Sequence, residues 1–529
     1  MLLLQFYQIR NISLCLSGII IAFLSGCNTE HEKAVRPPNI LFAIADDVSY
    51  PHMGAYGAKW IKTPAFDSVV SEGLLFENAY TPNAKCAPSR AIILTGRNSW
   101  QLEEAGNHYP NFPKKFKTFV ETLEDNNYHV GYTAKGWAPG RTEGGPRKLT
   151  GEKYSKRRLE SPTSGIASID YAANFEAFMQ DRQKDEPFCF WYGSYEPHRS
   201  YEYGTGNRLG GKKLSEIDKV FGFWPDNDTI RNDVLDYAFE IEHFDTHLGR
   251  MLATLARLGE LDNTIVIVTA DNGMPFPRIK GQAYEYANHL PLAIMWKDGI
   301  KHPGRKIEDF VSFADFAPTI LEIAGIDQAA SGMQPIQGKS MLPLFINEDY
   351  QPFRDHILIG KERHDVGRPA DVGYPIRGIV KGDFLYVKNF KTDRWPAGNP
   401  ETGYLNCDGS PTKTSILNLN RGGQTKYWDL NFGKRPDEEF YNIKDDPECL
   451  INLAGDEKYE KALSAMNKQM FEELEEQEDP RVLGRGDFFD KAEYMDPSTV
   501  HFYERYLSGE LSESDAGWVN ATDFEKPDQ

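Results

Sequence analysis

Four side chains that carry oxygen ligands follow two apolar runs of the sequence, 39–45 and 264–270. In chain order they are Asp46, Asp47, Asp271 and Asn272. If the runs are parallel neighbouring strands, these side chains meet at the carboxyl edge of a sheet, where open α/β sheets bind ligands. Three carboxylates repel one another unless a cation lies among them, and oxygen ligands suit Ca²⁺ or Mg²⁺. Either pair alone is better explained by helix capping or a turn, whereas both pairs together indicate a metal site.

A second candidate for chemistry is the segment Cys86-Ala-Pro-Ser-Arg90, which precedes the apolar residues 91–95 of a predicted helix. The N-terminus of a helix stabilises anions and lowers the pKa of a thiol. These residue types predict that Cys86 is an activated nucleophile beside the metal site. A buried, inert thiol is the alternative interpretation.

The same segment resembles the signature of the type I sulfatases, because Leu94-Thr-Gly-Arg97 follows it. Further matches to the family lie, in the expected order, at 38–41, 271–273, 318–325, 337–340 and 439–447. The resemblance implies that a maturation enzyme converts Cys86 to 3-oxoalanine (formylglycine). The hydrate attacks sulfur with one hydroxyl and expels sulfate with the other. The resemblance also implies one divalent cation, Ca²⁺ in preference to Mg²⁺, with the ligands Asp46, Asp47, Cys86, Asp271 and Asn272.

Basic groups complete the catalytic set that the resemblance implies. Arg90 is expected to hold the hydroxyls at position 86, and His198 to lie near the leaving-group atom. Lys135 and Lys280 match the lysines that contact sulfate in the family. Fixed cations stabilise the negative charge that develops in sulfuryl transfer, and a charged histidine donates a proton. Surface lysines and a capping histidine are the alternative interpretation.

One position departs from the family pattern. Many sulfatases carry a histidine two residues after the lysine that matches Lys135, and Trp137 occupies that place here. His108 is a candidate for the missing group, and an ordinary loop histidine is the other interpretation of this residue.

The details resemble the sulfamidase-like branch, the bacterial relatives of N-sulfoglucosamine sulfohydrolase (heparan N-sulfatase). The similarity rests on 197–199, the region of Trp137, 362–364, 374–377 and 395–398. It implies a sulfated saccharide substrate, with N- or O-linked sulfate, and a role in polysaccharide degradation. Arginine binds sulfate or carboxylate through two parallel hydrogen bonds. The candidate substrate-binding residues are His108, Arg199, Arg363, His364 and Arg377, and for the last three a structural role is the alternative.

Two other functions compete with this interpretation. A phosphatase or phosphodiesterase of the alkaline-phosphatase superfamily would share the metal ligands, but such enzymes usually place Ser or Thr at the nucleophile and bind two zinc ions. Cys86 with Pro88 and Arg90 argues against that class. A catalytically impaired, glycan-binding lipoprotein is the other alternative. Trp137 favours it, and the intact Cys86 and metal ligands argue against it.

The elements that must position these residues alternate between strands and helices. Apolar runs at 39–45, 188–192 and 264–270 read as buried strands, with helical stretches at 117–126 and 233–258 between them and another, with a loop, at 308–345. This order predicts an α/β fold with a large mixed, mainly parallel sheet between helices. The resemblance implies an alkaline-phosphatase-like sandwich.

The composition of the sequence and the length of its apolar runs change near residue 350. Short strands at 357–360 and 384–389 lie among polar loops, and a helix is predicted at 458–476. We therefore expect a catalytic domain over 37–350. The C-terminal subdomain and tail, 351–529, are expected to be α+β with a small antiparallel sheet.

The N-terminus and the net charge indicate where the protein works. Arg10 and the apolar run 12–23 are typical of a signal peptide, predicted over 1–26. Leu24-Ser-Gly-Cys27 resembles a bacterial lipobox, which implies cleavage before Cys27, lipidation of its thiol and a linker over 27–36. An ordinary secretory signal is the alternative. We expect an exported lipoprotein, periplasmic or on the outer membrane or cell surface, that meets the membrane by its lipid anchor only.

The formal net charge of −19 argues against nucleic acid as a partner, because phosphate binding needs a basic surface. A site for an anionic substrate must therefore be a local positive focus within a negative molecule.

Overall fold

The computed structural model describes residues 36–347 and 350–526. The described residues from Pro37 onward form one compact unit. The predicted signal peptide, Cys27 and the linker lie outside the described residues, apart from Arg36. Within the described part of the chain, no helix is both long and apolar enough to cross a membrane.

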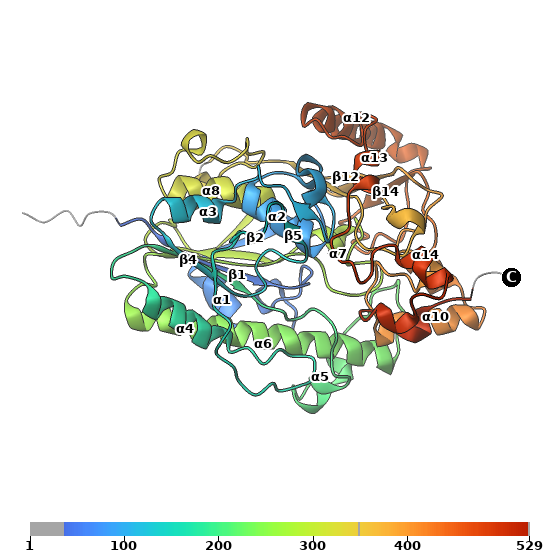
Figure 1. The fold of residues 1–529 in the computed structure, drawn as a ribbon, viewed down its shortest axis with the longest axis horizontal. Helices are drawn as coiled ribbons and strands as arrows, with labels where there is room; N and C mark the ends of the chain where they lie inside the picture. Colours follow the sequence, from blue (N-terminus) through green and yellow to red (C-terminus); the bar gives the residue numbers. More distant parts are fainter. Residues whose placement is uncertain (1–35, 348–349, 527–529) are drawn as a thin grey trace, which may run out of the picture. The chain divides into compact units, whose positions relative to one another are not determined.

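An eight-stranded sheet forms the centre of the region before residue 350 (Figure 1). Its order is β10–β2–β9–β8–β1–β7–β4–β6. The strands are β1 (Asn39–Ala45), β2 (Gly73–Tyr80), β4 (His129–Ala134), β6 (Glu152–Lys153), β7 (Phe188–Gly193), β8 (Thr264–Ala270), β9 (Leu292–Met295) and β10 (Arg305–Ser312). β1 pairs in parallel with both β7 and β8, and β9 alone in this sheet runs antiparallel to its neighbours. The predicted α/β fold with a mixed, mainly parallel sheet is confirmed.

Helices cover both faces of this sheet. Side chains of a strand alternate between its faces, so Leu41 and Ala43 of β1 pack into one apolar cluster and Ile40 and Phe42 into another. The first cluster contains residues of α1 (Pro64–Ser71), α4 (Tyr171–Asp181) and α6 (Asp228–Leu258). The second contains residues of α2 (Cys86–Thr95), α3 (Phe119–Asp125) and α8 (Phe316–Ile323). The sheet therefore lies between two layers of helices (Figure 1).

Capping residues set the helix boundaries. The side chain of Asn227 accepts a hydrogen bond from the backbone N–H of Ile230, and Gly259 ends the same helix in the left-handed conformation. The helix predicted from residue 233 therefore begins earlier, at Asp228. The helical prediction over 308–345 is wrong at its start, because residues up to Ser312 belong to strand β10, which pairs with β2.

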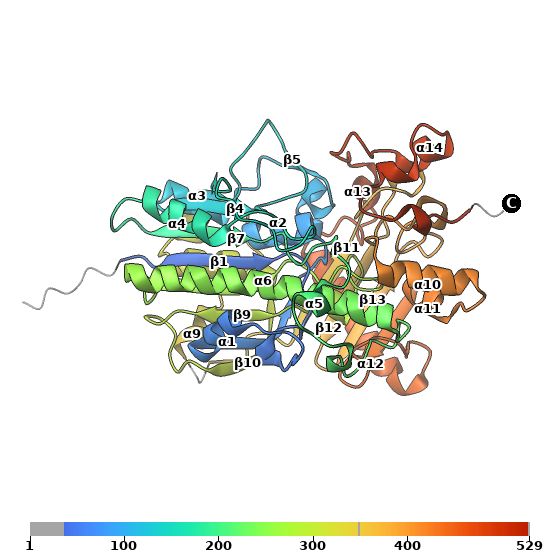
Figure 2. The same ribbon diagram turned by 90° about the horizontal axis from the view of Figure 1, so that it is seen from below.

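A second, antiparallel sheet of four strands follows residue 350. Its order is β11 (His356–Lys361), β12 (Ile376–Lys381), β13 (Phe384–Asn389) and β14 (Glu438–Asn442). Apolar side chains of one face pack against α12 (Glu460–Glu476), the predicted helix behind this sheet (Figure 2). The opposite face packs against Tyr80, Ala283 and Tyr284 of the preceding region. The described residues thus cluster as one unit, and the division at residue 350 stays a prediction.

Candidate active site

The strand ends bring the predicted metal ligands together. β1 and β8 are adjacent and parallel with Ala45 opposite Ala270, so the residues after them meet at one edge of the sheet. The backbone N–H of Asp47 donates to Asp271 Oδ1 at 3.1 Å, and Asn272 Nδ2 donates to Asp47 Oδ1 at 2.6 Å. One ligand atom each from Asp46, Asp47, Asp271 and the Cys86 thiol lie within 4.8 Å of one another. All of these side chains are buried.

The donor set fits a divalent cation that prefers oxygen. Three carboxylates share a space removed from water, and Asn272 Oδ1 is buried without any hydrogen-bond donor among the described residues. Burial, followed by the neighbouring Asp46 carboxylate, raises the pKa of Asp271. A cation at this point would satisfy the amide oxygen and offset the repulsion between the carboxylates.

Cys86 is the first residue of α2, and its Sγ lies 3.6 Å from Asp46 Oδ1. Burial raises the pKa of this thiol, Lys135 opposes the rise, and the Asp46 and Asp271 carboxylates add to it, so the expected lowering does not follow from the residues of the chain. A cation held by the cluster would act in the opposite direction, because metal coordination favours the thiolate.

Basic side chains surround this cluster. Lys135 Nζ lies 2.5 Å from Asp46 Oδ2, and Arg90 Nε lies 2.8 Å from Asp271 Oδ2. Arg90 Nη1 also donates to the backbone carbonyls of Lys135 and Gly136, which fixes the guanidinium. Burial opposes the ionisation of Asp46, yet Lys135, His198 and Arg90 together hold its pKa below the ordinary value. Arg90 Nη2 is buried without a hydrogen-bond acceptor among the described residues, so one of its donors is free for a ligand.

Lys280 and His198 lie next to Asp47. Lys280 Nζ contacts Asp47 Oδ2 at 2.7 Å and Asp408 Oδ2 at 2.9 Å. His198 Nδ1 lies 2.7 Å from the carbonyl oxygen of Arg199, which only accepts, so Nδ1 carries a proton. Its Nε2 then faces Asp47 Oδ2 at 4.0 Å. A third of the His198 side chain is exposed, whereas Lys135 and Lys280 are almost completely buried, so the histidine is the group most open to an entering ligand.

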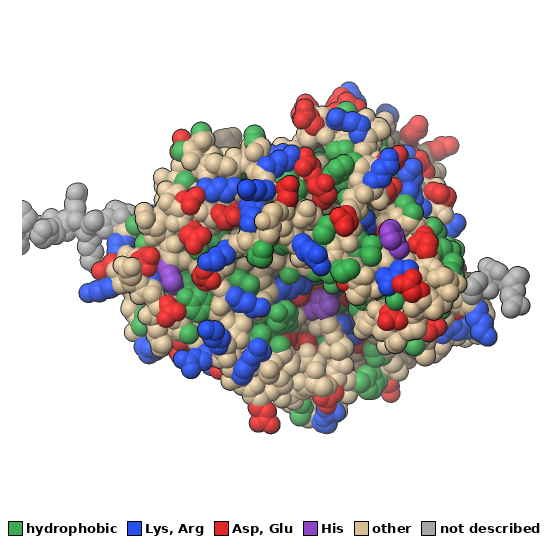
Figure 3. All heavy atoms as spheres, viewed as in Figure 1, with side chains coloured by type: hydrophobic (Ala, Val, Ile, Leu, Met, Phe, Trp, Pro, Cys, Tyr) green, Lys and Arg blue, Asp and Glu red, His purple; other side chains and the backbone are tan. Residues whose placement is uncertain are grey.

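A cavity of about 650 Å³ opens above these groups. Basic side chains and a histidine surround the hollow of the face in Figure 3. Among the predicted residues that line the cavity are Asp46, Cys86, His108, Lys135, His198, Arg199 and Lys280. The structure thus brings the predicted nucleophile, three of its basic partners and the metal cluster to a single cavity.

Sequence reasoning missed several lining residues, among them Lys85, Asp365 and Asp408. Lys85 Nζ lies 2.7 Å from Asp365 Oδ2, and the other oxygen of Asp365 lies 2.8 Å from His108 Nδ1. Burial and the positive charge of Lys85 lower the pKa of His108 to about 4, although the Asp365 carboxylate acts to raise it. Asp408, the partner of Lys280, also lines the cavity. Lys85 could have been predicted, because it directly precedes the cysteine motif. Asp365 and Asp408 lie in polar loops, where no sequence motif marks them as residues of the site.

Three of the predicted substrate-binding residues do not line this cavity. Each of them is instead hydrogen-bonded to other groups of the protein. Arg363 donates to the carbonyls of Ala492 and Glu493. His364 Nε2 contacts Asn83 Oδ1 at 3.0 Å. The third, Arg377, is paired with two buried carboxylates.

Arg199 does line the cavity, but its guanidinium is paired with Asp233 through two contacts of 2.8 and 2.9 Å. Trp137 also lies at the cavity, and its indole N–H donates to the carbonyl of Ala87, next to the predicted nucleophile. The residue that replaces the expected histidine therefore supports the start of α2.

A large α/β sandwich whose central strands end in a carboxylate cluster, with a cysteine at a facing helix start, defines a class of hydrolases that act on anionic esters. The sulfatase family model matches residues 38–326, and the chain belongs to this family. It is therefore a sulfatase, an enzyme that hydrolyses sulfate groups, and this assignment disfavours the phosphatase alternative.

Two curated relatives span most of the chain. N-sulphoglucosamine sulphohydrolase of Homo sapiens is 28% identical over 486 residues, which cover 84% of this chain and 92% of the relative. An ulvan-active sulfatase of Formosa agariphila is 25% identical over 520 residues, covering 89% and 82%. The predicted likeness to sulfamidase is consistent with the first of these.

Solved structures show the same fold. The complex of BT4656 with its substrate D-glucosamine-2-N,6-O-disulfate superposes with a TM-score of 0.60 at 20% identity, over 84% of this chain and 98% of the other. Phosphonate monoester hydrolase of Agrobacterium radiobacter gives 0.57 at 15% identity, over 83% and 96%. At these identities the likeness carries the fold alone, and it confirms the alkaline-phosphatase-like sandwich.

Proposed function

We propose that this sulfatase removes N- or O-linked sulfate from a sulfated saccharide through a 3-oxoalanine at position 86 and one divalent cation, Ca²⁺ in preference to Mg²⁺. The observation that carries the proposal is the buried cluster of Asp46, Asp47 and Asp271 with the unpaired Asn272 Oδ1, directly against Cys86.

The proposed modification and cation would supply two kinds of chemistry. A hydrated 3-oxoalanine at position 86 would supply two hydroxyls, one for attack on sulfur and one for release of the sulfate afterwards. Asp46, Asp47, Asp271, Asn272 and residue 86 would hold the cation, which would supply Lewis-acid polarisation.

The residues of the chain hold the charge and move the proton. Lys135 contacts Asp46 and Lys280 contacts Asp47, and both lysines stabilise the negative charge that develops on the sulfate oxygens. Arg90 offers its free Nη2 donor to the group at position 86. His198 in its charged form donates from Nε2 to the leaving oxygen or nitrogen, since Nδ1 is held by the Arg199 carbonyl.

The relatives support a saccharide substrate. Their names refer to N-sulphoglucosamine and ulvan, and one neighbour was solved with a disulfated glucosamine. We therefore propose a role in the degradation of sulfated polysaccharide. Cleavage after residue 26 and lipidation of Cys27 would place the enzyme outside the cytoplasm on a lipid anchor, and loss of fatty-acid labelling in a Cys27→Ser variant tests this part.

The test of the activity is a panel of N- and O-sulfated saccharides, with matched phosphate esters beside them and chromatographic detection of the product. Cys86→Ala should lower turnover by at least about a thousandfold. The matched control is Cys189→Ala, which removes another buried cysteine, on β7 and outside the cavity, and should retain turnover. The mass of the peptide that contains residue 86, together with metal analysis, identifies the nucleophile and cation.

Three outcomes would overturn the proposal. An unmodified thiol in active protein from the native host would exclude the 3-oxoalanine mechanism. Release of phosphate in preference to sulfate would restore the phosphatase alternative. Binding of saccharides without turnover of any of them would favour the glycan-binding lipoprotein.

A further inference from the structure

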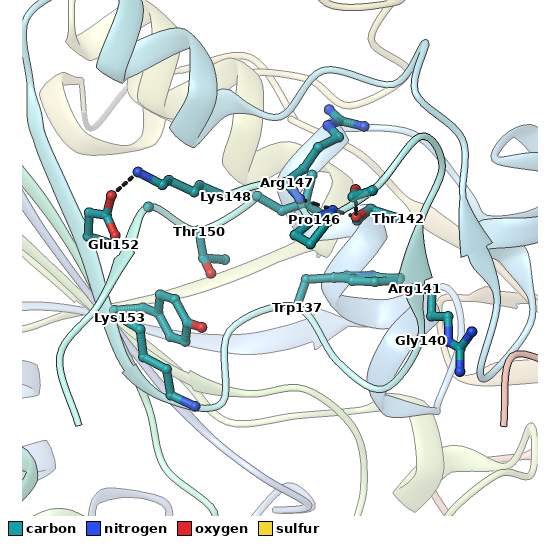
Figure 4. A pocket seen from close by; sticks show the side chains of 14 residues that line it. Trp137, Gly140, Arg141, Thr142, Pro146, Arg147, Lys148, Thr150, Glu152 and Lys153 are labelled. Atoms are coloured by element: carbon teal, nitrogen blue, oxygen red, sulfur yellow. Dashed lines mark hydrogen bonds and ion pairs between the residues drawn. The ribbon is translucent and has the colours of Figure 1, made fainter. Parts of the chain in front are cut away.

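A second cavity, of about 550 Å³, adjoins the catalytic cavity. It is formed by the segment that follows β4, from Trp137 to Lys153, and it shares Tyr132, Trp137 and Lys153 with the catalytic cavity. Figure 4 shows Trp137 in the middle of this second cavity, with Lys153 on one side and Arg141 on the other. A ligand longer than one sugar unit can therefore extend from the nucleophile past Trp137 into this space.

The second cavity is basic in a protein whose net charge is −19. Its lining contains the four cations Arg141, Arg147, Lys148 and Lys153, and Glu152 as its acid. Arg147 is neutralised by Glu121 just behind the wall, and Lys148 pairs with Glu152. Neither Arg141 nor Lys153 has an ion-pair partner among the described residues. Arg141 is offset only in part, by the Asp496 carboxyl, whose pKa it helps to lower. The cavity thus keeps positive charge beside the catalytic centre, which is the local focus that an anionic ligand needs.

Trp137 is a fixed platform between the two cavities. Its indole N–H donates to the Ala87 carbonyl at 3.2 Å, and its ring packs edge-on against Phe112 with centroids 5.0 Å apart. Gly140 approaches the ring so closely that a Cβ would stand 2.6 Å from it, at a φ of +146° that other residues rarely adopt. A partly exposed aromatic ring held in one place offers an apolar face to a sugar ring at a small cost in conformational entropy.

We propose that the second cavity binds the neighbouring part of the same saccharide chain, through sulfate or carboxylate groups that Arg141 and Lys148 recognise separately, since these two cations lie on opposite sides of Trp137 (Figure 4). This inference rests on the proposed function and adds to it a preference for an oligosaccharide whose adjacent unit is anionic. No side-chain hydrogen bond of Arg141 is found among the described residues. Lys148 would exchange its ion pair with Glu152 for the ligand, which costs little free energy because exposed ion pairs are weak.

The test compares substrates that share one cleaved unit. The first is the sulfated monosaccharide that the wild-type enzyme hydrolyses, and the others carry that unit next to a neutral sugar, a uronic acid or a sulfated sugar. Wild-type kcat/KM should be about tenfold higher for an anionic neighbour than for a neutral one, from two charge-assisted contacts of ordinary surface strength. The uronic acid and sulfated arms distinguish carboxylate from sulfate recognition.

The double variant Arg141→Ala/Lys148→Ala should lose this preference and retain kcat/KM on the monosaccharide, because neither residue lines the catalytic cavity. The matched control is Lys184→Ala/Lys301→Ala. It removes the same charge near the amino ends of the parallel strands, away from the catalytic residues at their carboxyl ends. Lys184 precedes β7, and Lys301 follows β9, which runs antiparallel. The control should retain the preference, and added salt should weaken the preference in the wild type only where the neighbour is anionic.

A direct measurement separates binding from turnover. In a Cys86→Ala background, calorimetry of the anionic oligosaccharide should show an affinity about tenfold lower when Arg141 and Lys148 are also replaced. Equal kcat/KM for neutral and anionic neighbours in the wild type, or an unchanged preference in the double variant, would overturn the inference while leaving the sulfatase proposal intact. Absence of turnover on every substrate would instead refute the proposed function.

Discussion

Arg377 binds carboxylates through two parallel hydrogen bonds, as the sequence suggested, but the carboxylates belong to the protein. Its guanidinium lies 2.6 Å and 2.9 Å from the two oxygens of Asp479 and 2.9 Å from Glu362. Arg481 binds the same Glu362, so two positive and two negative groups form a buried, neutral network. We predict that Arg377→Ala destabilises the protein and leaves substrate binding unchanged.

The magnitude follows from the contacts that the truncation removes. The variant loses the paired hydrogen bonds to Asp479, the contact with Glu362 and a cation–π contact with Trp100 at 5.3 Å. Breaking a buried pair by removing one partner costs about 3–5 kcal/mol, because the remaining charge stays buried without compensation. Arg481 still pairs with Glu362, so we expect a loss of about 3 kcal/mol, at the lower end of this range.

Urea unfolding followed by circular dichroism measures this loss, and kinetics with the preferred substrate measure KM. The double variant Arg377→Ala/Asp479→Ala should lose less stability than the sum of the single variants by at least about 1 kcal/mol, since it leaves no unpaired partner. Arg421→Ala is the matched control. It breaks the partly exposed pair with Glu525 and should cost less than about 1 kcal/mol. Unchanged stability with a raised KM in Arg377→Ala would refute the reasoning and restore a role in substrate recognition.

Three further predictions concern the cluster and the core. Added Ca²⁺ at a hundred times Kd should stabilise the wild type by about 2.7 kcal/mol, measured by urea unfolding, and Asp271→Asn should abolish this stabilisation. Equal stabilisation of the wild type and the variant would contradict the metal site. Asp408→Asn should lower kcat/KM about tenfold, because Lys280 loses a fixing partner; unchanged kinetics would contradict this role. Burial raises the pKa of Asp245 to about 7, so its contribution to stability is full below about pH 4 and lost as pH rises through 7. Asp245→Asn should remove this component from the pH dependence of the unfolding free energy, and an unchanged slope would contradict it.

Much of the fold was predictable because the strands next to the site are buried on both faces. The runs predicted at 39–45 and 264–270 coincide with β1 and β8, since continuous apolar stretches leave little doubt about where such strands begin and end. β9 and β10 were not predicted. β9 has four residues, and the partly exposed residues of β10 lack a continuous apolar pattern, so pairing with β2 decides their conformation.

The site was predictable where it lies close to such strands or to a motif. The carboxylates follow from topology, because residues after parallel neighbouring strands share one edge. The choice among arginines was not predictable, since Arg363 and Arg377 have the residue type that binds anions and their partners lie far away in sequence. Asp365 and Asp408 were missed for the same reason, because tertiary packing alone brings these loop residues to the cavity.

One wall of the catalytic cavity comes from Trp518, whose indole N–H donates to the Leu405 carbonyl. This residue is translated roughly 430 residues after Cys86, which at 5–20 residues per second takes on the order of 20 to 90 s. In the finished fold residue 86 is 2% exposed. The proposed conversion of this residue to 3-oxoalanine would therefore have to precede closure of the cavity, and the order of synthesis leaves an interval for it.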